Sequence, residues 1–127
     1  MDKLADIVNV SSSHELEDLH GGISNRDLTA RSRQAVALLR QRLHTFEGVL
    51  ARRGLRLTVY NDLAVAYEDT MYALDTLDRY FQSVEAATPA PLEPHGARIF
   101  AVYVAERFLD IMFYAEELDD GSDRRSR

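Results

Sequence analysis

Apolar residues recur every three or four positions over most of this chain, which is the period of amphipathic α-helices. The pattern predicts three long helices, over residues 25–53, 61–87 and 97–118, and none of these ranges contains a proline. Gly54 follows the first of them. Glycine at this place commonly adopts the left-handed conformation that ends a helix.

The segments outside the long helices give weaker signals. A short helix is predicted over residues 14–20, where acidic residues gather near its N-terminus and where Gly21 and Gly22 are expected to end it. Residues 1–11 are only weakly patterned. Residues 88–96 contain all three prolines of the chain and are predicted to form a stiff, extended connector.

Long helices joined by connectors of a few residues predict an all-α fold, an antiparallel helical bundle of three long helices plus a short N-terminal helix. At 127 residues the chain fits one domain, which we expect to span residues 1–118. Residues 119–127 carry charges of both signs and no apolar side chain. They are therefore predicted to form a disordered tail.

The helix predicted over 97–118 is apolar around most of its circumference, although a helix that packs on a core needs only one apolar face. Two neighbours in a bundle of three long helices would leave part of it uncovered. Val65 and Tyr72, seven residues apart, add apolar positions outside the core face of the preceding helix. We therefore expect a homodimer. Its candidate interface residues are Val65, Tyr72, Tyr103, Phe113 and Tyr114.

Composition narrows the classes of function. The net charge is −6, and the absence of cysteine excludes disulfides, thiolate metal sites and cysteine nucleophiles. No uncharged apolar run is long enough to cross a membrane, and the N-terminus lacks the basic and then apolar pattern of a signal peptide. We expect a soluble, cytoplasmic protein that uses no cofactor.

Positive charge is concentrated in one segment. Residues 25–56 hold eight arginines against two acidic residues, a net charge of +6, while the remainder of the chain sums to −12. Arg26, Arg33 and Arg40 follow one flank of the predicted helix. These arginines are either partners of carboxylates on other helices or a basic ridge that binds a protein or a nucleic acid. The acidic balance of the whole chain argues against a nucleic-acid binder.

A short pattern around His44 suggests a second function. Gly48 follows His44 by four residues and Gly54 by ten. Over residues 44–54 this spacing resembles the phosphoacceptor segment of histidine phosphotransfer domains, which are four-helix bundles of similar length. The resemblance implies that an exposed His44 accepts a phosphoryl group. Glu47 stands where that family has lysine, and an anion there repels a phosphoryl group.

Motifs for catalysis are missing from the sequence, which has no P-loop, no dinucleotide-binding glycine pattern, no nucleophile elbow and no pair of Glu-x-x-His motifs. The leading hypothesis is therefore a non-enzymatic helical protein that acts through protein–protein contact, as a homodimer or as a small regulator, inhibitor or adaptor. The alternatives are a phosphotransfer module that uses His44 and a nucleic-acid-associated protein that uses residues 25–56.

Overall fold

The computed structural model describes residues 3–125 of the chain, with side chains described up to Gly121. Every regular element in this range is helical, so the predicted all-α class is confirmed. The elements are α1 (Leu4–Val8), α2 (Glu15–Ser24), the 3-10 turn η1 (Arg26–Leu28), α3 (Thr29–Arg52), the 3-10 turn η2 (Leu57–Val59), α4 (Asn61–Glu85) and α5 (Pro94–Arg125).

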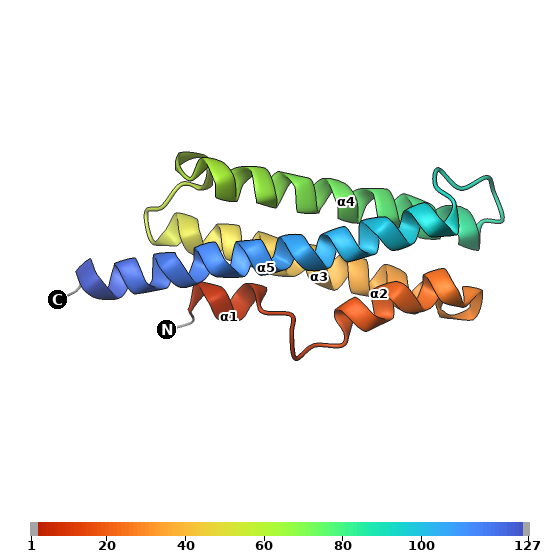
Figure 1. The fold of residues 1–127 in the computed structure, drawn as a ribbon, viewed down its shortest axis with the longest axis horizontal. Coiled ribbons are helices and arrows are strands. Elements are labelled where there is room, and N and C mark those ends of the chain that lie inside the picture. Colours follow the sequence, from red (N-terminus) through yellow and green to blue (C-terminus); the bar gives the residue numbers. More distant parts are fainter. Residues whose placement is uncertain (1–2, 126–127) are drawn as a thin grey trace.

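The helices form an antiparallel bundle with four positions (Figure 1). The helices α3, α4 and α5 fill one position each. The fourth is shared by α1 and α2, which lie one after the other along the bundle and both pack against α3 and α5. The antiparallel bundle is as predicted, whereas the expectation of one short N-terminal helix is corrected to two.

The first helix forms where the sequence shows no helical period. Leu4 and Val8 lie one turn apart, and both are fully buried. A helix of five residues leaves most of its N–H groups without a partner inside the helix. Two of them, on Leu4 and Ala5, donate to the carboxylate of Asp119 at 3.0 and 3.1 Å. Burial and this cap hold a helix that is too short to be stable by itself.

Asp119 also corrects the predicted end of the domain. The helix α5 continues beyond Leu118 to Arg125, and Asp119 is only 8% exposed. Its Oδ1 accepts a hydrogen bond from Arg53 Nη1 at 3.1 Å, just after the end of α3. The prediction of a disordered tail is therefore wrong for residues 119–125, and its last two residues lie outside the described range.

The two consecutive glycines allow close packing of helices. The helix α2 runs through Gly21 and Gly22 to Ser24, so the prediction that they end it is wrong. Gly22 N donates to Ser32 Oγ of α3 at 2.7 Å, and this hydroxyl donates to the carbonyl of Asp18. A Cβ on Gly22 would lie 2.8 Å from Cβ of Ser32. The missing side chain therefore lets α2 approach α3.

The ends of α3 and α4 share one pattern of hydrogen bonds. Gly54 follows α3 with a φ of 74°, as expected, and the next residue donates to the carbonyl of Leu50 at 2.9 Å. Ala87 follows α4 with a φ of 54°, and the next residue donates to the carbonyl of Ser83 at 3.0 Å. Both ends are Schellman motifs, but only the first has the glycine that this conformation favours.

We expect Asp119→Ala to lower the free energy of unfolding by about 2–3 kcal/mol, because two N–H groups of α1 and the guanidinium of Arg53 lose a charged acceptor. Urea titration followed by circular dichroism measures the change. The matched control is Asp120→Ala, which removes an exposed carboxylate at the next position of α5. Equal stability losses in the two variants would contradict the capping role.

The two helix ends predict opposite effects of exchanging glycine and alanine. Gly54→Ala should destabilise the protein by about 1 kcal/mol, since a Cβ there meets no neighbour within 4 Å and only the backbone conformation is strained. Ala87→Gly should stabilise it by about 0.5 kcal/mol, because relief of that strain exceeds the added entropy of the unfolded chain. Thermal and urea unfolding of both variants would test the sign.

Candidate functional site

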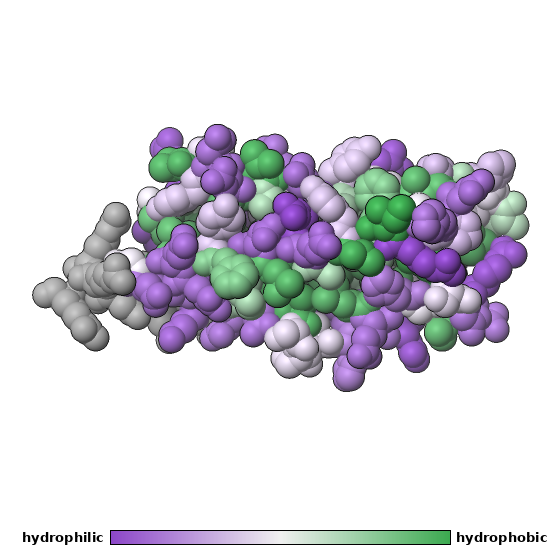
Figure 2. Space-filling view, viewed as in Figure 1, coloured by the Kyte–Doolittle hydropathy of each residue, from purple (hydrophilic) through white to green (hydrophobic). Residues whose placement is uncertain are grey.

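Four apolar side chains of α5 remain exposed and follow one line along the helix. They are Ile99 (57% exposed), Val102 (49%), Leu109 (51%) and Phe113 (61%), and we call them the α5 stripe. Figure 2 shows an apolar band over α5 on this face of the bundle. Their spacing of three, seven and four residues is that of a coiled-coil seam, with Glu106 at the skipped position.

A second apolar seam lies on roughly the opposite side of α5 and enters the core. Its residues are Ala97, Ala101, Val104, Phe108, Ile111 and Ala115, all at most 1% exposed. The helix α5 is thus apolar on both sides, and its neighbours α1, α2 and α4 bury only one of them. As expected from the width of its apolar arc, part of this helix remains uncovered in the single chain.

The residues predicted for an interface fall on two surfaces. Phe113 belongs to the α5 stripe. The others line two neighbouring cavities between α4 and α5, which we call the α4–α5 groove. Tyr72 and Tyr103 line a cavity of about 310 Å³, and Val65 and Tyr114 line one of about 260 Å³. Val65 and Tyr72 are exposed, whereas Tyr103 and Tyr114 are half-buried.

Polar groups of the groove cluster around one phenol. The hydroxyl of Tyr103 donates to Asp69 Oδ2 of α4 at 3.1 Å. The guanidinium of Arg107 lies 5.1 Å from the centre of the Tyr103 ring and pairs with Asp110 at 3.0 Å. Burial, followed by the hydrogen bond to Asp69, raises the pKa of Tyr103, and burial also raises the pKa of Tyr114. Both phenols therefore remain protonated at neutral pH.

Sequence reasoning does not identify the remaining residues of the α5 stripe and of the α4–α5 groove. The spacing of Ile99, Val102 and Leu109 signals a seam, but α5 contains two seams, and only one of them is buried against α1, α2 and α4. Asp69 is missed because its contact, Tyr103, lies 34 residues later in the chain. No local pattern brings these two residues together.

The predicted basic ridge faces carboxylates of α4. Arg33 forms ion pairs with Glu85 at 2.6 Å and with Asp78 at 3.7 Å, and Arg40 pairs with Asp75 at 3.0 Å. The hydrogen bond to Glu85 is the main cause of the raised pKa of Arg33. Exposed pairs of this kind contribute about 0.2–1 kcal/mol each. They therefore orient α3 against α4 more than they stabilise the fold.

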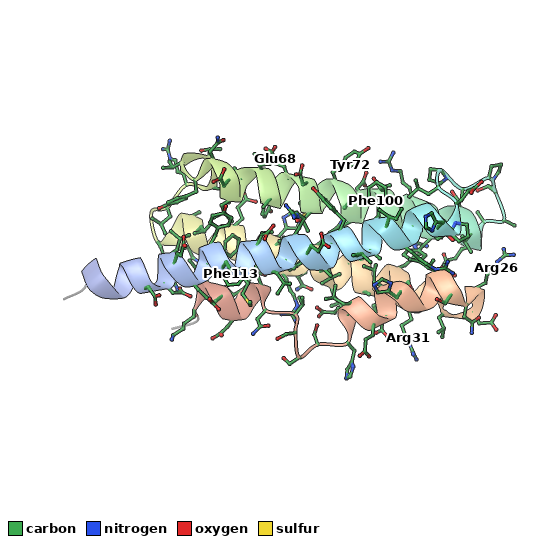
Figure 3. The ribbon with its side chains drawn as sticks, viewed as in Figure 1. Arg26, Arg31, Glu68, Tyr72, Phe100 and Phe113 are labelled. Atoms are coloured by element: carbon green, nitrogen blue, oxygen red, sulfur yellow. The ribbon has the colours of Figure 1, made fainter. Side chains whose placement is uncertain are left out.

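Other arginines from the same segment also contact neighbouring elements. Arg26 donates to the carbonyl of Val84 at 3.3 Å. Arg42 pairs with Glu15 of α2 at 2.7 Å. Arg31 is exposed on α3 (Figure 3). Much of the positive charge of residues 25–56 is thus directed at the protein itself.

His44 is exposed on α3, as the resemblance to phosphotransfer domains implies. One turn away, Glu47 accepts a hydrogen bond from the hydroxyl of Tyr67 at 2.7 Å. Burial of Tyr67 and this hydrogen bond raise the pKa of its phenol. The carboxylate at the position where that family has lysine is therefore held by α4, one helical turn from His44.

Neither a metal site nor a membrane span is found in the described part of the chain. No three histidine, aspartate or glutamate side chains of residues 3–121 are grouped so that they could hold a metal ion. None of the helices in the described part of the chain is long and apolar enough to cross a membrane.

The pairing of Arg33 and Arg40 predicts weak binding to nucleic acids. Short duplex and single-stranded probes should bind no more tightly than on the order of tens of micromolar at physiological salt, measured by fluorescence anisotropy. Binding through several phosphates would instead be tight at low salt and would weaken steeply as salt rises. That result would show that the arginines are free to leave their carboxylate partners.

Comparison with known proteins finds no family model, no curated protein and no solved structure that matches this chain.

Proposed function

We propose that this protein is non-enzymatic and acts through protein–protein contact, with a second copy of itself as the partner of the α5 stripe. The exposed stripe is the observation that supports this proposal. It spans residues 99–113, roughly 21 Å of helix. Single exposed apolar side chains are common on protein surfaces. Four of them in register on one helix are characteristic of a contact surface.

The charges beside the stripe favour an antiparallel pairing of the two copies. Arg98 lies at the N-terminal end of the stripe, and Glu116 and Glu117 follow its C-terminal end. An antiparallel twofold arrangement brings Arg98 of each copy near the two glutamates of the other. A parallel arrangement would place like charges together. Charge complementarity at the two ends therefore favours the antiparallel over the parallel dimer, and Glu106 of the two copies then lies near the twofold axis.

The size of the stripe sets the expected strength of the dimer. Burying each of these half-exposed side chains contributes on the order of 1 kcal/mol, and association costs several kcal/mol in lost translational and rotational freedom. We therefore expect the dissociation constant of the dimer to lie in the micromolar range or above. Such a dimer suits a small regulator, inhibitor or adaptor, because the residues that line the α4–α5 groove, apart from Ile99, lie outside the stripe and are available to another partner.

Light scattering on a sizing column tests the dimer at concentrations up to about hundreds of micromolar. The mass should approach twice the chain mass of 14.4 kDa as concentration rises. Leu109→Glu should return it to that of one chain, because in the antiparallel arrangement each new carboxylate would be buried against the apolar Val102 of the other copy. Since Leu109 is 51% exposed in the single chain, the variant should remain folded by circular dichroism.

The matched control is Val59→Glu, which places the same charge on an apolar residue that is 71% exposed at η2, away from α5. This variant should dimerise like the unchanged protein. A mass near 14.4 kDa at every concentration, or equal loss of the dimer in both variants, would rule out pairing through the α5 stripe.

A further inference from the structure

The larger cavity of the α4–α5 groove is lined almost entirely by aromatic and apolar groups around one carboxylate. Its volume is about 310 Å³, and it is open to solvent. Asp69 and Tyr72 of α4 and Ile99, Phe100 and Tyr103 of α5 form its wall. Figure 3 shows Tyr72 and Phe100 close to each other on the two helices. We call this cavity the Asp69 cup.

The carboxylate of Asp69 has a hydrogen-bond donor but no ion-pair partner among the described residues. It accepts the hydroxyl of Tyr103, and it takes part in none of the ion pairs found there. Other acids of the same helix differ, because Asp75 and Glu85 each pair with an arginine of α3. The carboxylate of Asp69 therefore lies unpaired in a half-buried, aromatic setting where a cation is attracted more strongly than in water.

The lining selects among the side chains that could enter. An apolar side chain would remove water from Asp69 without offering a donor, and an acidic one would be repelled. A suitable side chain must donate a hydrogen bond to the carboxylate and pack on the aromatic rings. An arginine does both, since its guanidinium stacks on aromatic faces and donates to a carboxylate. The chain uses this combination itself one turn away, where Arg107 lies over the Tyr103 ring and pairs with Asp110.

The second cavity of the groove indicates the form of the partner. Its apolar wall is formed by Val65, Ala66 and Tyr114, and Asp62, Arg107 and Asp110 also line it. Asp62 and Val65 precede Asp69 and Tyr72 of the Asp69 cup by seven positions. Seven residues of helix rise roughly 10 Å. Residues seven apart on a partner helix have the same separation, so one helix lying along the groove can fill both cavities.

We propose that the Asp69 cup binds the side chain of an exposed arginine on a helix of a partner protein, with an apolar residue of that helix in the second cavity. The cup shares Ile99 with the α5 stripe, but its carboxylate and its aromatic rings lie outside the stripe, so the proposal extends the function beyond self-association.

Nuclear magnetic resonance of the full chain tests the cup with N-acetyl-arginine methylamide as the probe. Signals of Tyr72, Phe100 and Tyr103 should shift in a saturable way, with a dissociation constant on the order of 10 mM. The citrulline analogue has the same shape without the charge and should give no saturable shift. Asp69→Asn should weaken binding of the arginine probe at least about tenfold.

Two variants distinguish binding of the arginine probe in the Asp69 cup from nonspecific binding elsewhere. Glu68→Gln removes a charge from the neighbouring exposed position of α4, outside the cup, and should leave binding unchanged (Figure 3). Tyr72→Leu keeps an apolar wall but removes a ring face, and should weaken binding. Equal shifts with citrulline, unchanged binding in Asp69→Asn, or no saturable shift up to about 50 mM would overturn the proposal.

A peptide arm tests the helical partner. An alanine-based helix with arginine and leucine seven residues apart should bind at least about tenfold more tightly than the single-residue probe, and moving the leucine by two residues should remove the gain. Absence of that gain would overturn the assignment to a helix. Leu109→Glu, which should abolish the dimer, should still bind the arginine probe, so failure of the dimer and failure of the cup are distinguishable.

Discussion

The carboxylate of Asp119 connects three parts of the chain that are distant in sequence. It caps the first turn of α1, accepts a hydrogen bond from Arg53 after α3 and belongs to α5. Because α1 has only five residues, its position depends on this cap and on the burial of Leu4 and Val8. Held in this way, α1 lies in line with α2, and the two short helices together occupy the fourth position of the bundle.

The helices α1, α2 and α4 together cover one side of α5. They enclose its core seam, and the opposite seam is left as the α5 stripe. Both seams have coiled-coil spacing, but they differ in one residue type. Glu106 interrupts the exposed stripe, whereas the buried seam contains no charged side chain, so burial of that seam leaves no carboxylate in the core.

The parts of the fold that could be predicted have local causes. The long helices follow from periodicity, and the left-handed Gly54 follows from its place after α3. The parts that could not be predicted depend on contacts between distant residues. The break between α1 and α2, the passage of α2 through Gly22 and the burial of Asp119 all require partners from other helices. At the candidate site, Phe113 and Tyr72 could be inferred from their apolar character, whereas Asp69 depends on its contact with α5.

The acidic residues of α4 have different partners on the two sides of this helix. On the side that faces α3, Asp75, Asp78 and Glu85 are matched by arginines, so these charges are satisfied within the chain. On the side that faces α5, Asp69 meets a phenol in place of a cation. A phenol can donate one hydrogen bond but cannot neutralise a carboxylate. The remaining charge therefore favours a cation from outside, and the aromatic wall around it favours arginine over the more strongly hydrated lysine.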